Sequence, residues 1–135
     1  MKDLHNIIKP VRVRSPAVAG TTGTKAGQVI DMAGFESIEF IIANGAQGSS
    51  VTVTPVIKSG SATGSLASCA DSELLGTEAA AAALLAGAGG ANAVAKIGYI
   101  GSDRYVTCDL IIGGAATGVH SVVGIQGGPR KAPTT

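Results

Sequence analysis

Few side chains in this sequence are of the types that bind metals or act as nucleophiles, and their spacing brings none of them together. His5 lies in a charged N-terminal stretch and His120 within an apolar run, while Cys69 and Cys108 form neither a CxxC pair nor a Cys/His spacing. Because zinc needs a set of converging ligands, this pattern predicts no metal site. The cysteines are expected to be reduced, structural thiols, although a disulfide between them would also fit the sequence.

Catalysis by carboxylates or by a nucleophile is not indicated either. Cys108 precedes Asp109 directly, and neighbours on a strand point to opposite faces, so this pair cannot act together. Asp71, Glu73 and Glu78 form a local acidic group. A capped helical turn accounts for Asp71 and Glu73 without any substrate. The sequence therefore predicts a protein that is not an enzyme and has no cofactor.

Phosphate, nucleic-acid and membrane binding are not indicated by the remaining patterns. Residues 20–25 (GTTGTK) and the glycines at 87–90 lack the spacings of phosphate-binding loops. Two Tyr, two Phe and no Trp, with a net charge of +1, leave few stacking platforms and no field that attracts nucleic acid or anionic lipid. The Ala/Gly run 79–95 is too short and too weakly apolar to span a bilayer, and residues 1–14 do not read as a signal peptide.

The elements that would position any site are short strands. Hydrophobic residues make up 45% and charged residues 14% of the 135 residues, which predicts one folded domain with a core of small aliphatic side chains. Apolar runs separated by Gly, Ser, Asn and Pro are typical of antiparallel β structure. The expected strands are residues 7–14, 28–32, 37–43, 51–58, 94–100, 104–112 and 119–126.

Several local signals refine this expectation. The apolar end of strand 37–43 predicts burial on both faces. Pro10 predicts an edge strand or a bulge, and Pro55 places its strand near a sheet edge. Residues 101–103 predict a tight hairpin turn and residues 113–118 a looser one. Asp71 is expected to cap a single helical turn, and residues 78–85 to form either a short helix or an ordered loop. The fold class is all-β: a single-domain antiparallel β-sandwich over residues 1–135, jelly-roll-like or Ig-like, with one short helical insertion.

Both ends of the chain are locally basic. Segments 1–14 and 127–135 are expected to be extended, and either their cations are simply solvated or the segments are arms that dock on an acidic protein surface. In the second case the interface residues are Lys9, Arg12, Arg14, Arg130 and Lys131.

Four stretches carry a resemblance that spans nearly the whole chain. They are residues 1–6 (MKDLHN), 71–79 (DSELLGTEA), 96–106 (KIGYIGSDRYV) and 128–133 (GPRKAP). Together they resemble a family of small proteins of tailed bacteriophages and prophages that are encoded among virion structural genes, near the major capsid protein. The chain departs from the family pattern at Gly128, where a His often precedes the closing Pro-Arg, and in the Gly/Ala stretch 86–93.

This resemblance implies a minor capsid protein of the decoration or cement type. Such a structural protein would be a homo-oligomer that binds the lattice of the major capsid protein in the virion, after assembly in the cytoplasm of the bacterial host. Two alternatives are kept. One is a head-to-tail joining or tail-terminator protein that forms a ring. The other, of a different class, is a carbohydrate-binding or host-binding β-sandwich module, which usually needs more exposed aromatic residues than this chain offers.

Overall fold

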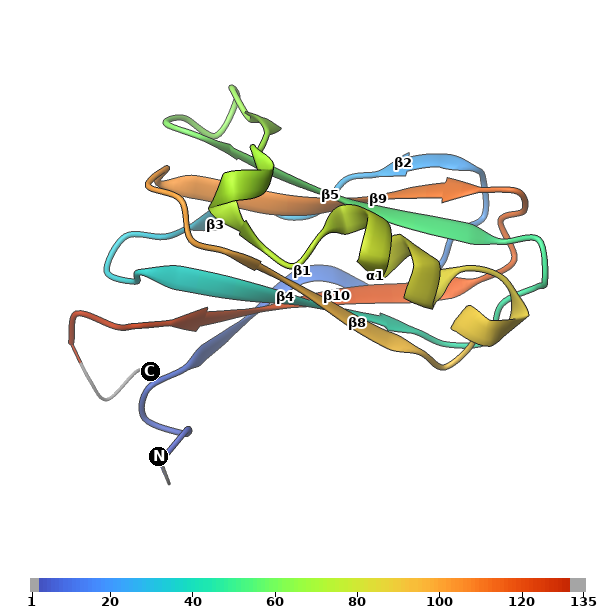
Figure 1. The fold of residues 1–135 in the computed structure, drawn as a ribbon, viewed down its shortest axis with the longest axis horizontal. Helices are drawn as coiled ribbons and strands as arrows, with labels where there is room; N and C mark the ends of the chain where they lie inside the picture. Colours follow the sequence, from blue (N-terminus) through green and yellow to red (C-terminus); the bar gives the residue numbers. More distant parts are fainter. Residues whose placement is uncertain (1–2, 132–135) are drawn as a thin grey trace.

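The structure, a computed structural model, describes residues 3–131 and consists of two antiparallel sheets packed face to face (Figure 1). Strands take up 47% of the chain and helices 11%, which confirms the predicted all-β sandwich with a short helix. The largest fully buried side chains include Tyr99 and Phe40, and small aliphatic residues fill the rest of the core.

The elements follow one another along the chain. They are β1 (Lys9–Val18), β2 (Gly23–Lys25), β3 (Ile30–Asp31), β4 (Ser37–Asn44), β5 (Thr52–Gly60), β6 (Ala67–Ser68), η1 (Asp71–Glu73), β7 (Leu74–Leu75), α1 (Glu78–Leu85), η2 (Ala88–Gly90), β8 (Val94–Tyr99), β9 (Tyr105–Gly113) and β10 (Val119–Gly127). Sheet A has the strand order β1-β10-β4-β8-β7, and sheet B has the order β2-β9-β5-β6, with β3 also paired to β9.

The connectivity is that of a jelly roll. If the two-residue strands β3 and β7 are set aside and the other eight are renumbered in chain order, one sheet runs 1-8-3-6 and the other 2-7-4-5. These interleaved orders are the pattern that two Greek keys produce when they are wrapped into a sandwich. Of the two topologies left open by the sequence, the structure therefore has the jelly roll.

The connections predicted as hairpins cross between the sheets instead. Residues 101–103 lead from β8 in sheet A to β9 in sheet B, and residues 113–118 lead from β9 back to β10 in sheet A. The hairpin prediction was wrong because turn residues mark a reversal of the chain without specifying the next pairing partner. A side chain at Gly101 would collide with the ring of Tyr99, and the N–H of Asp103 donates to Tyr99 Oη at 3.1 Å, so the first crossover wraps around that buried tyrosine.

Strand β4 is buried on one face only. Ile38, Phe40 and Ile42 lie in the core, whereas Ile41 and Ala43 point outward and stay half-exposed. The expectation of burial on both faces was wrong because no second layer covers the outer side of sheet A within residues 3–131. The continuous apolar run instead gives the molecule an apolar outer surface.

The helical insertion forms as a true helix. Thr77 is the N-cap of α1, and its Oγ1 accepts from the N–H of Ala80 at 3.1 Å. The earlier turn, η1, begins at Asp71 itself, one residue earlier than predicted, because extended Ala70 takes the N-cap position and Asp71 is already helical. No helix in the part of the chain that the structure describes is long and apolar enough to cross a membrane.

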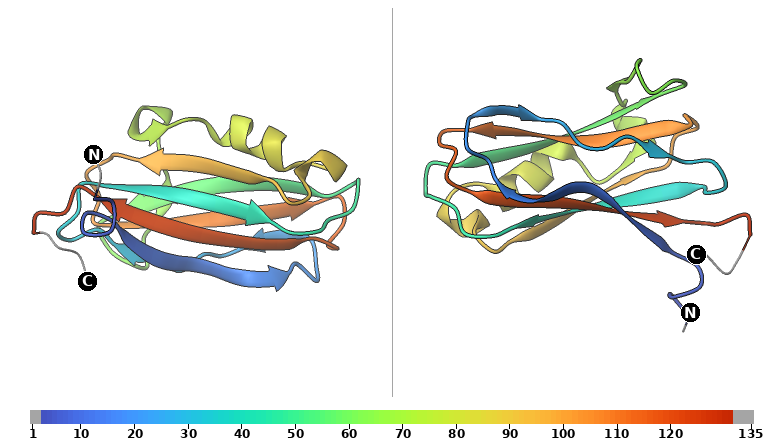
Figure 2. Two further views of the ribbon diagram at one scale, coloured as in Figure 1. Left: turned by 90° about the horizontal axis from the view of Figure 1, so that it is seen from below. Right: turned by 180° about the vertical axis from the view of Figure 1, so that it is seen from behind.

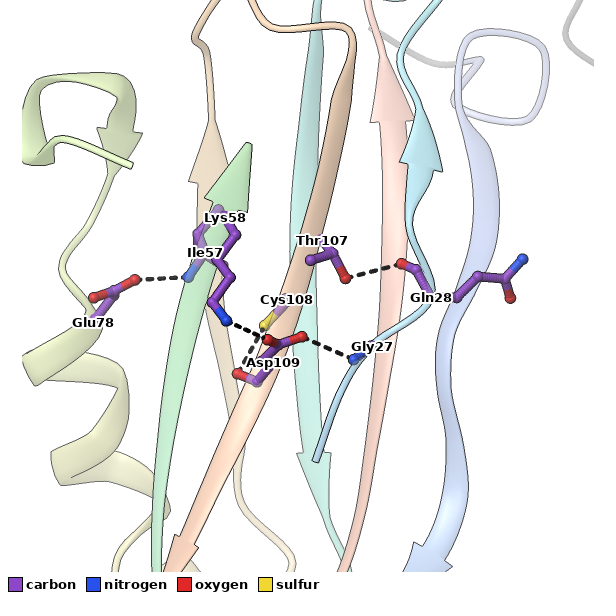
Figure 3. A network of polar contacts seen from close by, with 8 residues as sticks. All are labelled: Gly27, Gln28, Ile57, Lys58, Glu78, Thr107, Cys108 and Asp109. Atoms are coloured by element: carbon purple, nitrogen blue, oxygen red, sulfur yellow. Dashed lines mark hydrogen bonds and ion pairs between the residues drawn. The ribbon is translucent and has the colours of Figure 1, made fainter. Parts of the chain in front are cut away.

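One lateral opening of the sandwich is closed by α1. The helix lies between β5 and β8, with Ala81 and Leu85 buried against them, and Glu78 Oε1 accepts from the N–H of Ile57 at 2.7 Å (Figure 3). Pro55 and Ile57 are two residues apart on β5, so their backbone groups point to the same side of the strand, towards α1 and away from β9. The N–H that proline lacks therefore removes no hydrogen bond between β5 and β9. The prediction that Pro55 lies near a sheet edge is thus confirmed.

The opposite opening is closed by the loop between β2 and β3. The N–H of Gln28 donates to the carbonyl of Val13 on β1 at 2.7 Å, and the N–H of Gly27 donates to Asp109 Oδ1 on β9 at 2.9 Å. Lys58 Nζ holds the other carboxylate oxygen of Asp109 at 2.9 Å (Figure 3). The strand predicted over residues 28–32 is therefore reduced to Ile30 and Asp31, because the residues before it leave β9 to reach β1.

Gly27 provides a test of this closure. A Cβ at this position would overlap the carbonyl of Cys108 and lie 2.7 Å from Val13 Cγ1, whereas at Gly64 it would meet nothing within 4 Å. Gly27→Ala is expected to lower the free energy of unfolding by roughly 1–3 kcal/mol through overpacking, and Gly64→Ala to change it by less than about 0.5 kcal/mol. Urea unfolding of the wild type and both variants measures this. Equal stabilities would show that the loop is not tightly held.

Candidate protein-interaction site

The first and last described segments of the chain meet at one end of the sandwich (Figures 1 and 2). Lys9 pairs with Gln126 in the register of β1 and β10, and the N–H of Arg130 donates to the carbonyl of Gly34 at 2.9 Å. Lys9, Arg130 and Lys131, which the sequence placed at opposite ends of the chain, therefore lie at the same end of the molecule, while Arg12 lies further along β1, opposite Val123 in the middle of β10. Residues 1–2 and 132–135 of the two predicted segments lie outside the described residues.

Strand β1 is an edge strand of sheet A, as Pro10 predicted. Its register with β10 shifts between Arg12 and Arg14 and again between Arg14 and Ala17, and it carries a second proline, Pro16. Bulges, prolines and lysines are the features by which natural sheets discourage the addition of a further strand. The side chains of β1, more than its backbone, are thus suited to contact a partner.

A groove of about 380 Å³ separates β1 from β3 and contains two of the predicted cations. It is lined by Lys9, Val11, Arg12, Gln28, Val29, Ile30, Asp31 and Gln126. Arg12 makes long contacts to Gln28 Oε1 at 3.3 Å and Ser15 Oγ at 3.4 Å. Among the described residues, no carboxylate oxygen lies within 4.0 Å of the Lys9 or Arg12 nitrogens. Both cations therefore remain available for an external anion.

The one carboxylate in this groove is already engaged. Arg104 contacts Asp31 with two parallel bonds, Nε to Oδ1 at 3.1 Å and Nη2 to Oδ2 at 2.9 Å. The pKa of Asp31 is lowered, first by the bond from Arg104 and then by the N–H of Ala33. This ion pair joins residues 73 positions apart, and sequence reasoning missed it because no local pattern links them.

A second groove, of about 510 Å³, contains Arg130. It is lined by Met32, Ala33, Gly34, Phe35, Glu36, Gly101, Ser102, Asp103, Arg104 and Arg130. Asp103 accepts from Ser59 Oγ at 2.7 Å, and Glu36 lines the same groove without forming an ion pair with Arg130 within 4.0 Å. This end of the sandwich is thus a mixture of acids and bases in which most acids have internal partners and the terminal cations do not.

Arg14 differs from the other predicted interface residues. It is half-buried, and its Nε is enclosed without a hydrogen-bond partner in the described structure. Its charge acts on the buried His120 on the neighbouring strand. The structure therefore separates Arg14 from Lys9 and Arg12, because the bulge after Arg12 alters which way the following side chains point.

His120 belongs to a buried polar network at the other end of the sandwich. Its side chain is 0% exposed, and its Nδ1 lies 2.9 Å from Asn44 Oδ1. The Asn44 amide nitrogen donates to Gln47 Oε1 and to the carbonyls of Leu85 and Gly90. Asn44 Oδ1 is therefore an acceptor, and His120 carries a proton on Nδ1, while its buried Nε2 has no hydrogen-bond partner in the described structure. This network attaches the glycine-rich stretch 86–93 to the sandwich.

The remaining reactive groups do not form a chemical centre. His5 is exposed and far from His120 in the sequence, and within residues 3–131 no three His, Cys, Asp or Glu side chains are grouped so that they could hold a metal ion. Cys69 and Cys108 are both free, which confirms the predicted unbonded thiols. Burial raises the pKa of both thiols and keeps them protonated.

Comparison with known proteins identifies no relative. The sequence matches no family model, and a search of curated proteins finds no match.

The buried histidine should make stability depend on pH. Burial, assisted by Arg14, lowers the pKa of His120 in the folded protein below its ordinary value of 6.5. The unfolded chain then binds a proton that the folded chain does not, so the free energy of unfolding should fall as the pH drops below about 6.5. In His120→Gln this part of the pH dependence should disappear, while His5→Gln at an exposed position should retain it. Denaturant unfolding at several pH values measures the effect, and identical pH profiles for wild type and His120→Gln would contradict it.

Proposed function

We propose that this chain is a structural virion protein of a tailed bacteriophage, which binds the major capsid lattice as a decoration or cement subunit. The observation that carries the proposal is the gathering of Lys9, Arg130 and Lys131 at one end of the sandwich, with Arg12 further along β1 in the same groove as Lys9, all without carboxylate partners among the described residues. Cations of this kind fit an acidic protein surface, where Arg offers a planar pair of donors to a carboxylate.

The fold supports the same assignment. A jelly-roll sandwich is an architecture that viral capsid proteins use, although the same fold also occurs in lectins and enzymes. Its closed sides and short loops make it a rigid body, and a rigid subunit loses little conformational entropy when it docks on a lattice. The resemblance of residues 71–79 and 96–106 to small phage proteins points to the same role.

Binding to shells tests the proposal directly. In a variant with Lys9→Gln, Arg12→Gln and Arg130→Gln, affinity for undecorated shells is expected to drop about tenfold or more, since each exposed ion pair contributes up to about 1 kcal/mol. Lys25→Gln is the matched control, because Lys25 lies on β2 towards the opposite end, where its Nζ donates to Oγ1 of the exposed Thr21 at 2.8 Å. Co-sedimentation with shells at low and high salt measures the affinity of the triple variant and of the control. Binding of the wild type should weaken at high salt, because salt screens the contacts. Wild-type affinity in the triple variant would contradict this mode of docking.

The number of subunits per purified particle separates the proposal from the ring-forming alternative. A lattice-binding protein should be present in a copy number on the order of hundreds, following the repeat of the shell, whereas a head-to-tail ring has on the order of ten copies. Quantitative protein analysis of purified particles distinguishes these outcomes, and the complete absence of the chain from particles would exclude both.

A further inference from the structure

No second layer of the described chain covers the outer face of sheet A (Figure 2, left). Val123 on β10 lies opposite Ile41 on β4, and Ala43 on β4 lies opposite Val94 on β8, so the outward side chains form a continuous patch across three strands. Val94 is 60% exposed and Val123 is 40% exposed. Single exposed apolar residues are ordinary on protein surfaces, but a contiguous patch usually marks an interface.

The patch continues into an apolar groove between β8 and α1. The groove has a volume of about 440 Å³ and is lined by Ile41, Gly76, Thr77, Ala80, Ala81, Leu84, Val94, Ala95 and Lys96. Leu84 on its rim is 60% exposed, as is Val94, while the adjacent Leu85 is fully buried in the core. We call Ile41, Leu84, Val94 and Val123 the apolar face. It provides both protruding side chains and a hollow that could accept them.

Two opposite charges lie close together at the centre of this surface, and one further cation, Arg12 on β1, lies at its margin opposite Val123. Glu39 and Lys96 are the only Asp, Glu, Lys or Arg residues in β4, β8 and β10, and both point outward. Lys96 lies opposite Ile41, and Glu39 lies opposite Gly98, which places the two charges diagonally on neighbouring strands. The described structure contains no ion pair between them within 4.0 Å. Each therefore lacks a close partner of opposite sign.

We propose that the apolar face binds a second copy of this chain around a two-fold axis that passes between Glu39 and Lys96. In such an isologous pair the same patch is used twice, so Glu39 of one copy meets Lys96 of the other and the reverse contact forms as well. A patch with one acid and one base at its centre and apolar residues next to them is complementary to itself, whereas a strongly charged partner would leave one of the two central charges facing its own sign. Arg12 borders the apolar face at Val123 and also belongs to the proposed shell-binding cations, so the pairing is tested with substitutions at other positions.

Charge reversal tests the two-fold pairing by sedimentation equilibrium. The wild type is expected to be a dimer. Glu39→Lys gives a face with two cations and Lys96→Glu a face with two anions, so each alone should dimerise at least about a hundredfold more weakly because like charges oppose each other. An equimolar mixture of the two variants should recover the dimer mass, and the double variant Glu39→Lys with Lys96→Glu should dimerise like the wild type. A purely structural effect of either substitution would not be rescued by mixing.

A pair of apolar substitutions provides the matched control. Val94→Ser on the apolar face should weaken dimerisation about tenfold or more, while Ile111→Ser should not, although Ile111 is 42% exposed on the outer face of the opposite sheet. Thermal unfolding confirms that each variant is folded. A monomeric wild type, an assembly of another order, or single charge variants that remain dimeric would overturn the proposal. Binding of the same variants to shells is measured separately by co-sedimentation. A failure to dimerise therefore does not by itself contradict the proposed function.

Discussion

Two packed sheets expose unpaired backbone groups along their outer strands, and satisfying those groups shapes much of this molecule. On one side Glu78 of α1 accepts from the N–H of Ile57. Pro55, two residues earlier, has no N–H that needs a partner. On the other side Asp109 receives the N–H of Gly27 and holds the loop that reaches β1. Glu78 and Asp109, two of the acids considered for chemistry in the sequence, thus help to close the sandwich.

The two candidate surfaces differ in the physics of their contacts. The terminal end contributes exposed cations, whose contacts are individually weak, screened by salt and easily reversed. The outer side of sheet A contributes aliphatic area, whose burial is nearly independent of salt and scales with the surface removed from water. A subunit with both kinds of surface can keep a stable partner on one side while it adjusts its contacts on the other.

Local patterns predicted the strands well and their partners poorly. The alternation in residues 51–58 located β5 almost to its ends, and the runs before and after residue 101 located β8 and β9. Which sheet each strand joins depends on contacts between residues far apart in sequence, so the crossovers looked like hairpins. The same reason hid the pairing of Asp31 with Arg104 and the burial of His120 beside Asn44. The cations at both ends were visible in composition, but only the fold brings them to one place.

The position of β10 has a consequence for how the chain is made. The last strand to be synthesised lies in the interior of sheet A, between the first strand, β1, and β4. Until residues 119–127 have left the ribosome, β1 has no neighbour and β4 has only β8. The sheet therefore closes only once this strand is available, through contacts of long sequence separation, and folding of this kind is slow and leaves apolar strands exposed in the meantime. Those strands are the part of the chain that a chaperone would have to shield until β10 is in place.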